Sequence, residues 1–201
     1  MKYYWVIGEH NRRDLQVLSS VIKDEPESTE IRLIFLESYP NKVINKLGLG
    51  FKIYNKKLKF TDIIKNDTGL PIFSNRLKEK CEREGIEGYQ TYKIEILNIK
   101  DLKELKIEAN MLPYWYIHLP MIKGVLDIKK SKEGEVSKFH GKKVYNFTIP
   151  AFKEKKLDKI GIDLFRMAEE NGVGIYASEK FVKMFKKNKF DGASFSEIIL
   201  V

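Results

Sequence analysis

The feature of this 201-residue sequence that most constrains its fold is an internal repeat with an offset of 104 residues. Residues 70–96 and 174–200 align without a gap. The matched positions are Ser74 with Ser178, Leu77 with Phe181, Cys81 with Phe185, and Ile86-Glu87-Gly88 with Phe190-Asp191-Gly192. A shared register over these positions favours one structural unit that is used twice.

Each copy of the repeat predicts a strand, a capped helix, a tight turn and a second strand. A short apolar run leads into Ser74 or Ser178, whose hydroxyl can accept from the free N–H groups of a first helical turn. Apolar residues follow at i+3 and i+7, which places them on one face of a helix of about three turns. An acidic residue and a glycine then favour a tight turn into the next strand.

Further strands are predicted outside the repeat. Aromatic and β-branched residues indicate strands at Tyr3–Gly8, Ile31–Leu36, Tyr89–Leu97, Tyr114–Leu119 and Val144–Ile149, and alternation over Phe51–Phe60 indicates a hairpin. With 43% hydrophobic residues, the chain can build a sizeable core. We therefore expect an α+β fold with mixed or antiparallel sheets and few short helices. Its two related strand–helix–strand halves, residues 1–105 and 106–201, would pack as one compact unit.

The motifs of common catalytic sites are missing from the sequence. It contains no GxSxG elbow, P-loop, HExxH or EF-hand loop. The three histidines, His10, His118 and His140, lack metal-ligand spacing, and the single cysteine, Cys81, falls on the apolar face of the first repeat helix. We therefore expect no catalytic residue, no cofactor and no metal, and a protein that is not an enzyme.

The charge of the chain is unevenly distributed. Lysine and arginine total 37 against 28 acidic residues, a net charge of +9, yet the first 50 residues are neutral with seven of each kind. The basic excess therefore lies in residues 51–201. Such an excess suits an acidic partner, either a protein or a nucleic acid. Lysines scattered among acidic residues are also typical of an ordinary solvated surface, and this interpretation stays open.

Two segments are candidates for partner binding. In the first, cations alternate with aromatic residues, as at Lys52, Tyr54, Lys56 and Lys57, a pattern that can stack bases and neutralise phosphates. The second is an acidic loop that can face a basic partner, with Asp24, Glu25, Glu27 and Glu30 as its charges. A hairpin with one core-facing side and a solvated loop are the simpler interpretations of the two segments.

The sequence also predicts a location in the cell. Its longest unbroken apolar runs have only a few residues, whereas a membrane-spanning helix needs about 20. The first residues become polar too soon for a signal peptide. We expect a cytoplasmic protein with no membrane partner.

Three stretches of the sequence belong together: Pro71–Leu77, then Tyr114–Tyr116 with Gly124–Ser131, and finally Ile162–Ala168 running on to Tyr176–Phe181. Together they resemble the immunity protein 11 family of bacterial polymorphic toxin systems. In order, they give a strand that ends in Ser before a helix, an aromatic strand with an Asp-x-x-x-Ser turn, and a second Ser-initiated helix. The order and spacing agree over about residues 69–195.

This resemblance implies a non-catalytic protein that binds and neutralises a cognate toxin domain. It supplies no toxin-contacting residue, so the matched positions are expected to be scaffold. The alternative function is a basic nucleic-acid-binding module that uses Phe51–Phe60 and the lysine-rich C-terminal half.

Overall fold

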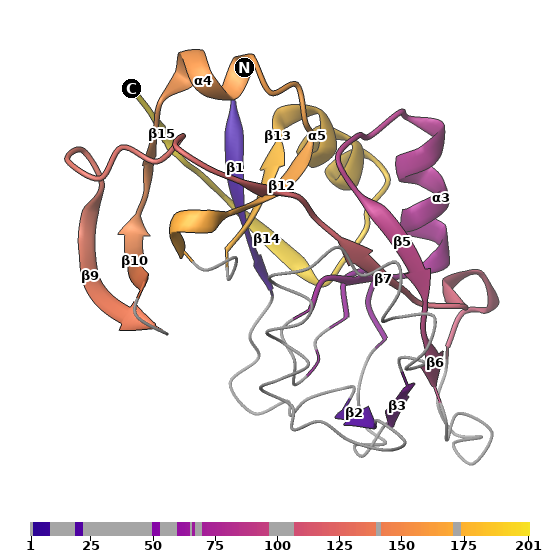
Figure 1. Cartoon of the computed structure of the whole chain (residues 1–201). Helices are drawn as coiled ribbons and strands as arrows, with labels where there is room; N and C mark the ends of the chain where they lie inside the picture. The colour runs from indigo at the N-terminus through magenta and orange to yellow at the C-terminus, as the bar shows by residue number, and fades with distance from the viewer. Residues whose placement is uncertain are drawn as a thin grey trace.

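The computed structural model of this chain describes residues 2–8, 19–21, 50–52, 60–64, 66, 70–96, 107–139, 142–170 and 174–201. Its strands form several mixed and antiparallel sheets, with short helices between them (Figure 1). This arrangement confirms the predicted α+β class.

The largest sheet contains five strands in the order β14-β1-β13-β12-β8. Its members are β1 (Tyr3–Gly8), β8 (Met121–Ile122), β12 (Leu164–Met167), β13 (Ile175–Ser178) and β14 (Ala193–Glu197). Neighbouring strands are antiparallel except β12 and β8, which run parallel. Helix α5 (Glu179–Lys187) follows β13 directly and leads to β14.

A second sheet repeats part of this arrangement with three strands in the order β4-β7-β5. Its members are β4 (Ile72–Phe73), β5 (Gln90–Lys93) and β7 (Trp115–His118), and both pairs are antiparallel. Helix α3 (Asn75–Arg83) lies between β4 and β5 in the sequence, as α5 lies between β13 and β14.

The remaining described elements are short pairs and single turns. Strands β2 (Ser19–Val21), β3 (Gly50–Lys52) and β6 (Glu95–Ile96) form a third sheet, and β11 (Ala151–Phe152) pairs with β15 (Ile199–Leu200). Strands β9 (Lys132–Phe139) and β10 (Lys142–Ile149) form a hairpin at the side of the molecule opposite α3 (Figure 1). The short helices are η3 (Ala109–Met111), α4 (Glu154–Asp158) and η4 (Ala168–Glu170).

Helices α3 and α5 begin in the way that the sequence predicts. The Ser74 hydroxyl accepts a hydrogen bond from the Leu77 amide at 3.2 Å, and the Ser178 hydroxyl accepts one from the Phe181 amide at 3.3 Å. Each serine therefore satisfies one of the amides that a helix N-terminus leaves without an intrahelical partner.

The two helices also end alike. The Ile86 amide donates to the Cys81 carbonyl at 2.9 Å, and the Phe190 amide donates to the Phe185 carbonyl at 3.2 Å. In both, the residue before the donor is left-handed, with φ of 60° at Gly85 and 54° at Lys189. This is the hydrogen-bond pattern of a Schellman C-cap.

In each of these two sheets, a strand from the other half of the chain lies between the two strands that flank the helix in sequence. Strand β1, in residues 1–105, lies between β13 and β14, and β7, in residues 106–201, lies between β4 and β5. Trp5 is opposite both Tyr176 and Ser196, while Tyr116 is opposite both Ile72 and Tyr92. An offset of 104 converts Ile72 into Tyr176 and Tyr92 into Ser196, so Tyr116 and Trp5 occupy matching places.

The central core cluster joins these two sheets through both helices. Leu77 and Cys81 of α3 lie in the same buried cluster as Phe181 and Phe185 of α5. The rings of Phe73 and Phe181 are stacked there at 6.1 Å. Alternate residues of β7 and β1 point away from this central cluster and lie in two further buried clusters, one around Phe51 and Tyr116 and one around Tyr3 and Phe165.

The strand predictions agree with the structure to different degrees. Tyr3–Gly8 is β1 as predicted, Tyr114–Leu119 contains β7, and Val144–Ile149 is the C-terminal part of β10. Tyr89–Leu97 is divided into β5 and β6. Ile31–Leu36 and residues 53–59 of the expected hairpin lie outside the described residues. Within the described part of the chain, no helix is both long enough and apolar enough to cross a membrane.

Candidate binding surface

The hairpin of β9 and β10 presents the most distinctive surface of the described residues. Its strands pair antiparallel, with Val136 opposite Tyr145, Gly134 opposite Phe147 and Lys138 opposite Lys143. Residues directly opposite each other share a face, and successive residues alternate between faces. The register therefore assigns every described side chain of the hairpin to one of two faces.

We call one of them the lysine face. It consists of Lys132, Gly134, Val136 and Lys138 of β9 and Lys143, Tyr145, Phe147 and Ile149 of β10. Its described side chains include three lysines and no carboxylate. The opposite face carries Glu135, Ser137, Val144, Asn146 and Thr148. The register thus places Lys132, Lys138 and Lys143 on one face and Glu135 on the other.

The aromatic side chains of the lysine face are held in place by their neighbours. The rings of Tyr145 and Phe147 are 6.0 Å apart and within 8° of parallel. A Cβ atom on Gly134 would lie 2.3 Å from the Phe147 ring, so that ring lies across the glycine backbone. Both aromatic residues are partly buried against the core cluster around Phe165. The ring pair is therefore ordered by packing before any partner arrives.

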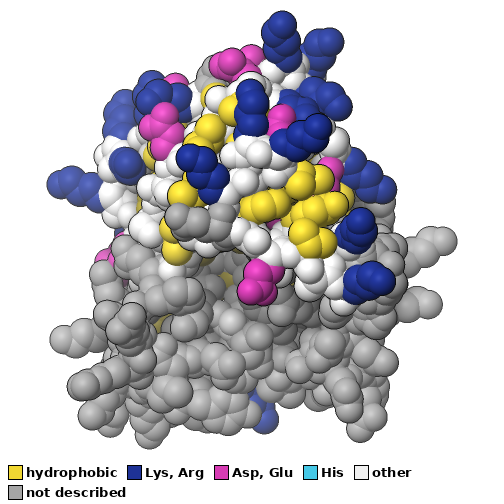
Figure 2. All heavy atoms as spheres, turned by 90° about the vertical axis from the view of Figure 1, so that its left-hand side faces the viewer, with side chains coloured by type: hydrophobic (Ala, Val, Ile, Leu, Met, Phe, Trp, Pro, Cys, Tyr) yellow, Lys and Arg dark blue, Asp and Glu magenta, His cyan; other side chains and the backbone are white. Residues whose placement is uncertain are grey.

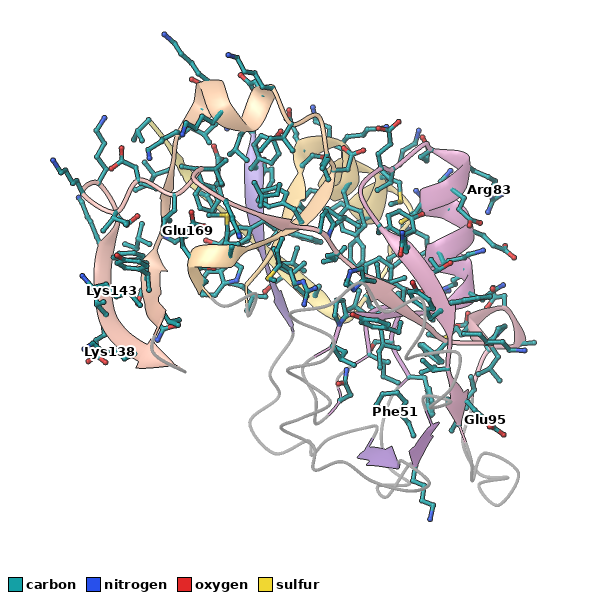
Figure 3. All side chains as sticks on the ribbon, in the orientation of Figure 1. Phe51, Arg83, Glu95, Lys138, Lys143 and Glu169 are labelled. Carbon is teal, nitrogen blue, oxygen red and sulfur yellow. The ribbon has the colours of Figure 1, made fainter. Side chains whose placement is uncertain are left out.

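Apart from the partly buried Ile149, the rest of this face is open to solvent. Val136 is 58% exposed, and Lys132, Lys138 and Lys143 are exposed as well. Figure 2 looks onto the side of the molecule that carries the hairpin and shows hydrophobic side chains with both basic and acidic side chains around them. Figure 3 shows Lys138 and Lys143 on the hairpin, at the side of the molecule away from Arg83 of α3. The result is a small apolar area with cations around it.

Two buried aspartates near the helix starts form polar networks of a structural kind. The Asp62 carboxylate accepts from the Ser74 hydroxyl at 2.6 Å and from the Arg76 guanidinium at 2.6 and 2.7 Å. Asp163 accepts from the Ser178 hydroxyl and from the Glu87 amide at 3.0 Å. Both serine hydroxyls are thus used in helix caps and carboxylate contacts.

The buried titratable groups are also explained by packing. Burial raises the pKa of the Cys81 thiol, which keeps it protonated and unreactive. Burial, together with the charge of Arg166, lowers the pKa of His118 to about 4. Burial raises the pKa of Glu170 to about 7, although the Tyr176 hydroxyl donates to its carboxylate at 2.7 Å and opposes the shift. Among the described residues, no group of three His, Cys, Asp or Glu side chains could hold a metal ion.

Most of the partner-binding residues predicted from the sequence fall outside the described residues: Asp24, Glu25, Glu27, Glu30, Tyr54, Lys56 and Lys57. Lys52 is described; it is the last residue of β3 and is partly buried opposite Ser19. The sequence interpretation missed the lysine face. The alternation of Lys143, Tyr145, Phe147 and Ile149 predicts a strand, but it does not identify β9 as the neighbouring strand.

No protein-family model matches the chain, and no curated protein is similar to it at a significant level.

Proposed function

We propose that this chain is a cytoplasmic, non-catalytic immunity protein that binds a cognate bacterial toxin domain and neutralises it by occlusion. The observation that carries the proposal is the lysine face, where the exposed Val136 lies beside an ordered aromatic pair and three exposed lysines. An apolar centre with a charged rim is the usual anatomy of a protein–protein interface. The resemblance to the immunity protein 11 family supports the same function.

Occlusion requires a larger contact than the hairpin alone. A stable complex of this kind buries roughly 1,200–2,000 Å² of total surface, so the hairpin would be one part of the interface. The net charge of +9 would accelerate encounter with an acidic partner and select it over basic ones. The toxin would lose activity because its active site is covered or its motion is blocked.

We also propose that the two halves of the chain are copies of one unit. The matched N-caps, the matched C-caps and the matching places of β1 and β7 support this origin. Under this proposal each copy contributes its first strand to the sheet of the other.

The function is tested by co-expressing the full chain with the polymorphic-toxin C-terminal domain encoded beside it. The proposal predicts a stable one-to-one complex on purification and growth of cells that the toxin domain alone arrests. Growth arrest that persists, with no complex recovered, would contradict it.

A nucleic-acid-binding module is the second candidate function. The observation in its favour is again the lysine face, because lysines beside aromatic rings can bind a single strand. Binding of this kind weakens steeply with salt as bound phosphates release counterions. An oligonucleotide affinity in the micromolar range or tighter at 150 mM salt, in the absence of toxin binding, would favour this candidate.

A further inference from the structure

We infer that the lysine face of the β9–β10 hairpin is the docking surface for an acidic, partly apolar surface of the toxin domain. The inference rests on the proposed function and adds to it the site and the chemistry of the partner. Its occupant is a folded protein surface that presents carboxylates around an apolar contact.

Lys138 and Lys143 form a cross-strand pair of like charge. The two are directly opposite in the antiparallel register, both are exposed, and they share one face. Like charges in directly opposite positions destabilise a strand pair. No ion pair within the described part of the chain involves either lysine. The pair therefore opposes hairpin formation in the free protein, and carboxylates on a partner would remove that repulsion.

The lysine face and the opposite face of the hairpin differ in the charges of their described side chains. Glu135 lies between Gly134 and Val136 in the sequence, yet the alternation of the strand points it to the opposite face. Its carboxylate is thereby directed away from the lysine pair. A face whose described charges are all positive matches an acidic surface and repels a basic one.

The centre of the lysine face is apolar and ordered. Val136 is opposite Tyr145, so its exposed side chain extends the area made by the stacked rings of Tyr145 and Phe147. Because the rings are already fixed against Gly134 and the core, a partner that covers them loses little side-chain entropy on binding. Rigid aromatic anchors with cations at the rim are typical of binding hot spots.

The same features favour a protein partner over a nucleic acid. The ring pair is partly buried and has an aliphatic side chain, Val136, beside it, so the centre of the face is apolar. Three lysines can neutralise only a few phosphates, whereas nucleic-acid sites usually make many such contacts.

The decisive variant is Lys138→Glu in the full chain. It replaces a repulsive cross-strand pair with an attractive one, so we expect the thermal midpoint to stay the same or rise. The same change places a carboxylate against the acidic surface of the toxin domain, so we expect its Kd to rise at least about 30-fold. A purely structural role for Lys138 would not combine unchanged or higher stability with weaker binding.

The matched control is Lys93→Glu. Lys93 is also an exposed strand lysine, but it lies in β5, at the other side of the molecule from the hairpin (Figure 1). It changes the net charge by the same amount, so it reports any effect of overall charge on affinity. We expect its Kd to stay within about threefold of the wild-type value, since an exposed charge far from an interface contributes little.

The outcomes separate this inference from the proposed function. If the wild-type chain binds the toxin domain and Lys138→Glu binds equally well, the docking inference is wrong while the immunity function stands. If the wild-type chain does not bind the toxin domain, both are wrong. If the wild-type chain instead binds a single-stranded 20-nucleotide probe and Lys138→Glu loses that binding, the face serves nucleic acid and the inference is again wrong.

Discussion

The carboxylate of Asp62 accepts a hydrogen bond from the backbone amide of Asp191 at 3.1 Å, across 129 residues of sequence. Asp163 makes the matching contact between the halves: its carboxylate accepts a hydrogen bond from the amide of Glu87 at 3.0 Å. Each buried aspartate thus connects the start of one helix to the acid–glycine turn that follows the other. These two contacts join the halves of the chain reciprocally.

Removing the Asp62 carboxylate is expected to destabilise the protein strongly. In Asp62→Ala the guanidinium of Arg76 and the Ser74 hydroxyl lose their buried acceptor. Asp62 is fully buried and Arg76 is partly exposed, so we expect the unfolding free energy to fall by about 2–4 kcal/mol, chiefly from the buried donors left without an acceptor. Urea unfolding followed by circular dichroism measures the change. The control is Glu82→Ala, which removes the exposed carboxylate of an i,i+4 pair with Lys78 and should change the unfolding free energy by less than about 0.5 kcal/mol. Equal effects of the two variants would contradict this account.

Gly192 should tolerate no side chain. Its φ is +94°, and an added Cβ would lie 2.2 Å from the Ile63 carbonyl oxygen. Gly192→Ala therefore combines a strained backbone with a clash against backbone, and we expect a loss of about 3 kcal/mol or more. The matched control is Gly161→Ala, where φ is +62° and nothing lies within 4 Å of the added atom. That variant should lose only about 1 kcal/mol, from the left-handed conformation alone. Thermal unfolding of both variants measures the difference.

The stability of the protein should depend on the protonation of Glu170. Burial raises the pKa of this carboxyl from 4.5 to about 7. Between these pH values the folded state keeps a proton that the unfolded state has lost, so the contribution of Glu170 to stability falls as pH rises. Glu170→Gln removes the titration, and its stability relative to wild type should rise by about 2–3 kcal/mol between pH 4.5 and 7. Urea unfolding at several pH values tests this, and a difference that does not vary with pH would contradict it.

The protonation of His118 should make stability depend on pH in the opposite sense to Glu170. Burial and the charge of Arg166 lower its pKa from 6.5 to about 4. The unfolded state then binds a proton that the folded state excludes, so stability falls as pH drops from 6.5 toward 4. We expect the His118 ring resonances to titrate near pH 4 in an NMR experiment. A midpoint near 6.5 would show that the ring is solvated.

Strand β1 lies between strands of residues 106–201, and β7 lies between strands of residues 1–105. We therefore predict that neither half folds alone. A protease site inserted between Ile96 and Ile107 would let the folded chain be cut into its halves. Because each half supplies a strand that lies between two strands of the other half, we expect the cut protein to elute as one particle. After separation in urea, each fragment should stay unfolded by circular dichroism, and mixing should restore the native spectrum. A fragment that refolds alone would show that its sheet does not need the strand from the other half.

The sequence predicted the local units well because their signals are local. The caps at Ser74 and Ser178, the helices that follow them and the strand Tyr3–Gly8 each depend on residues within one short window. The α+β class followed from those units alone. The left-handed Lys189, where the other helix has Gly85, was not foreseen, because lysine carries no sequence signal for that conformation.

The arrangement of the units could not be predicted, because pairing partners are distant in sequence. Nothing near Trp5 indicates that it lies between Tyr176 and Ser196. The lysine face was missed for the same reason: Lys138 and Lys143 become one cationic pair only when the hairpin register is known.

The direct test of the proposed immunity function is calorimetry of the full chain with the toxin domain that this function predicts to be encoded beside it, paired with a growth-rescue assay. We expect a one-to-one complex with a submicromolar Kd and restored growth for the wild-type chain and for Lys93→Glu. For Lys138→Glu we expect an unchanged fold, weaker binding and lost rescue. No heat of binding and no rescue with the wild-type chain would show that the chain is not an immunity protein for this toxin domain.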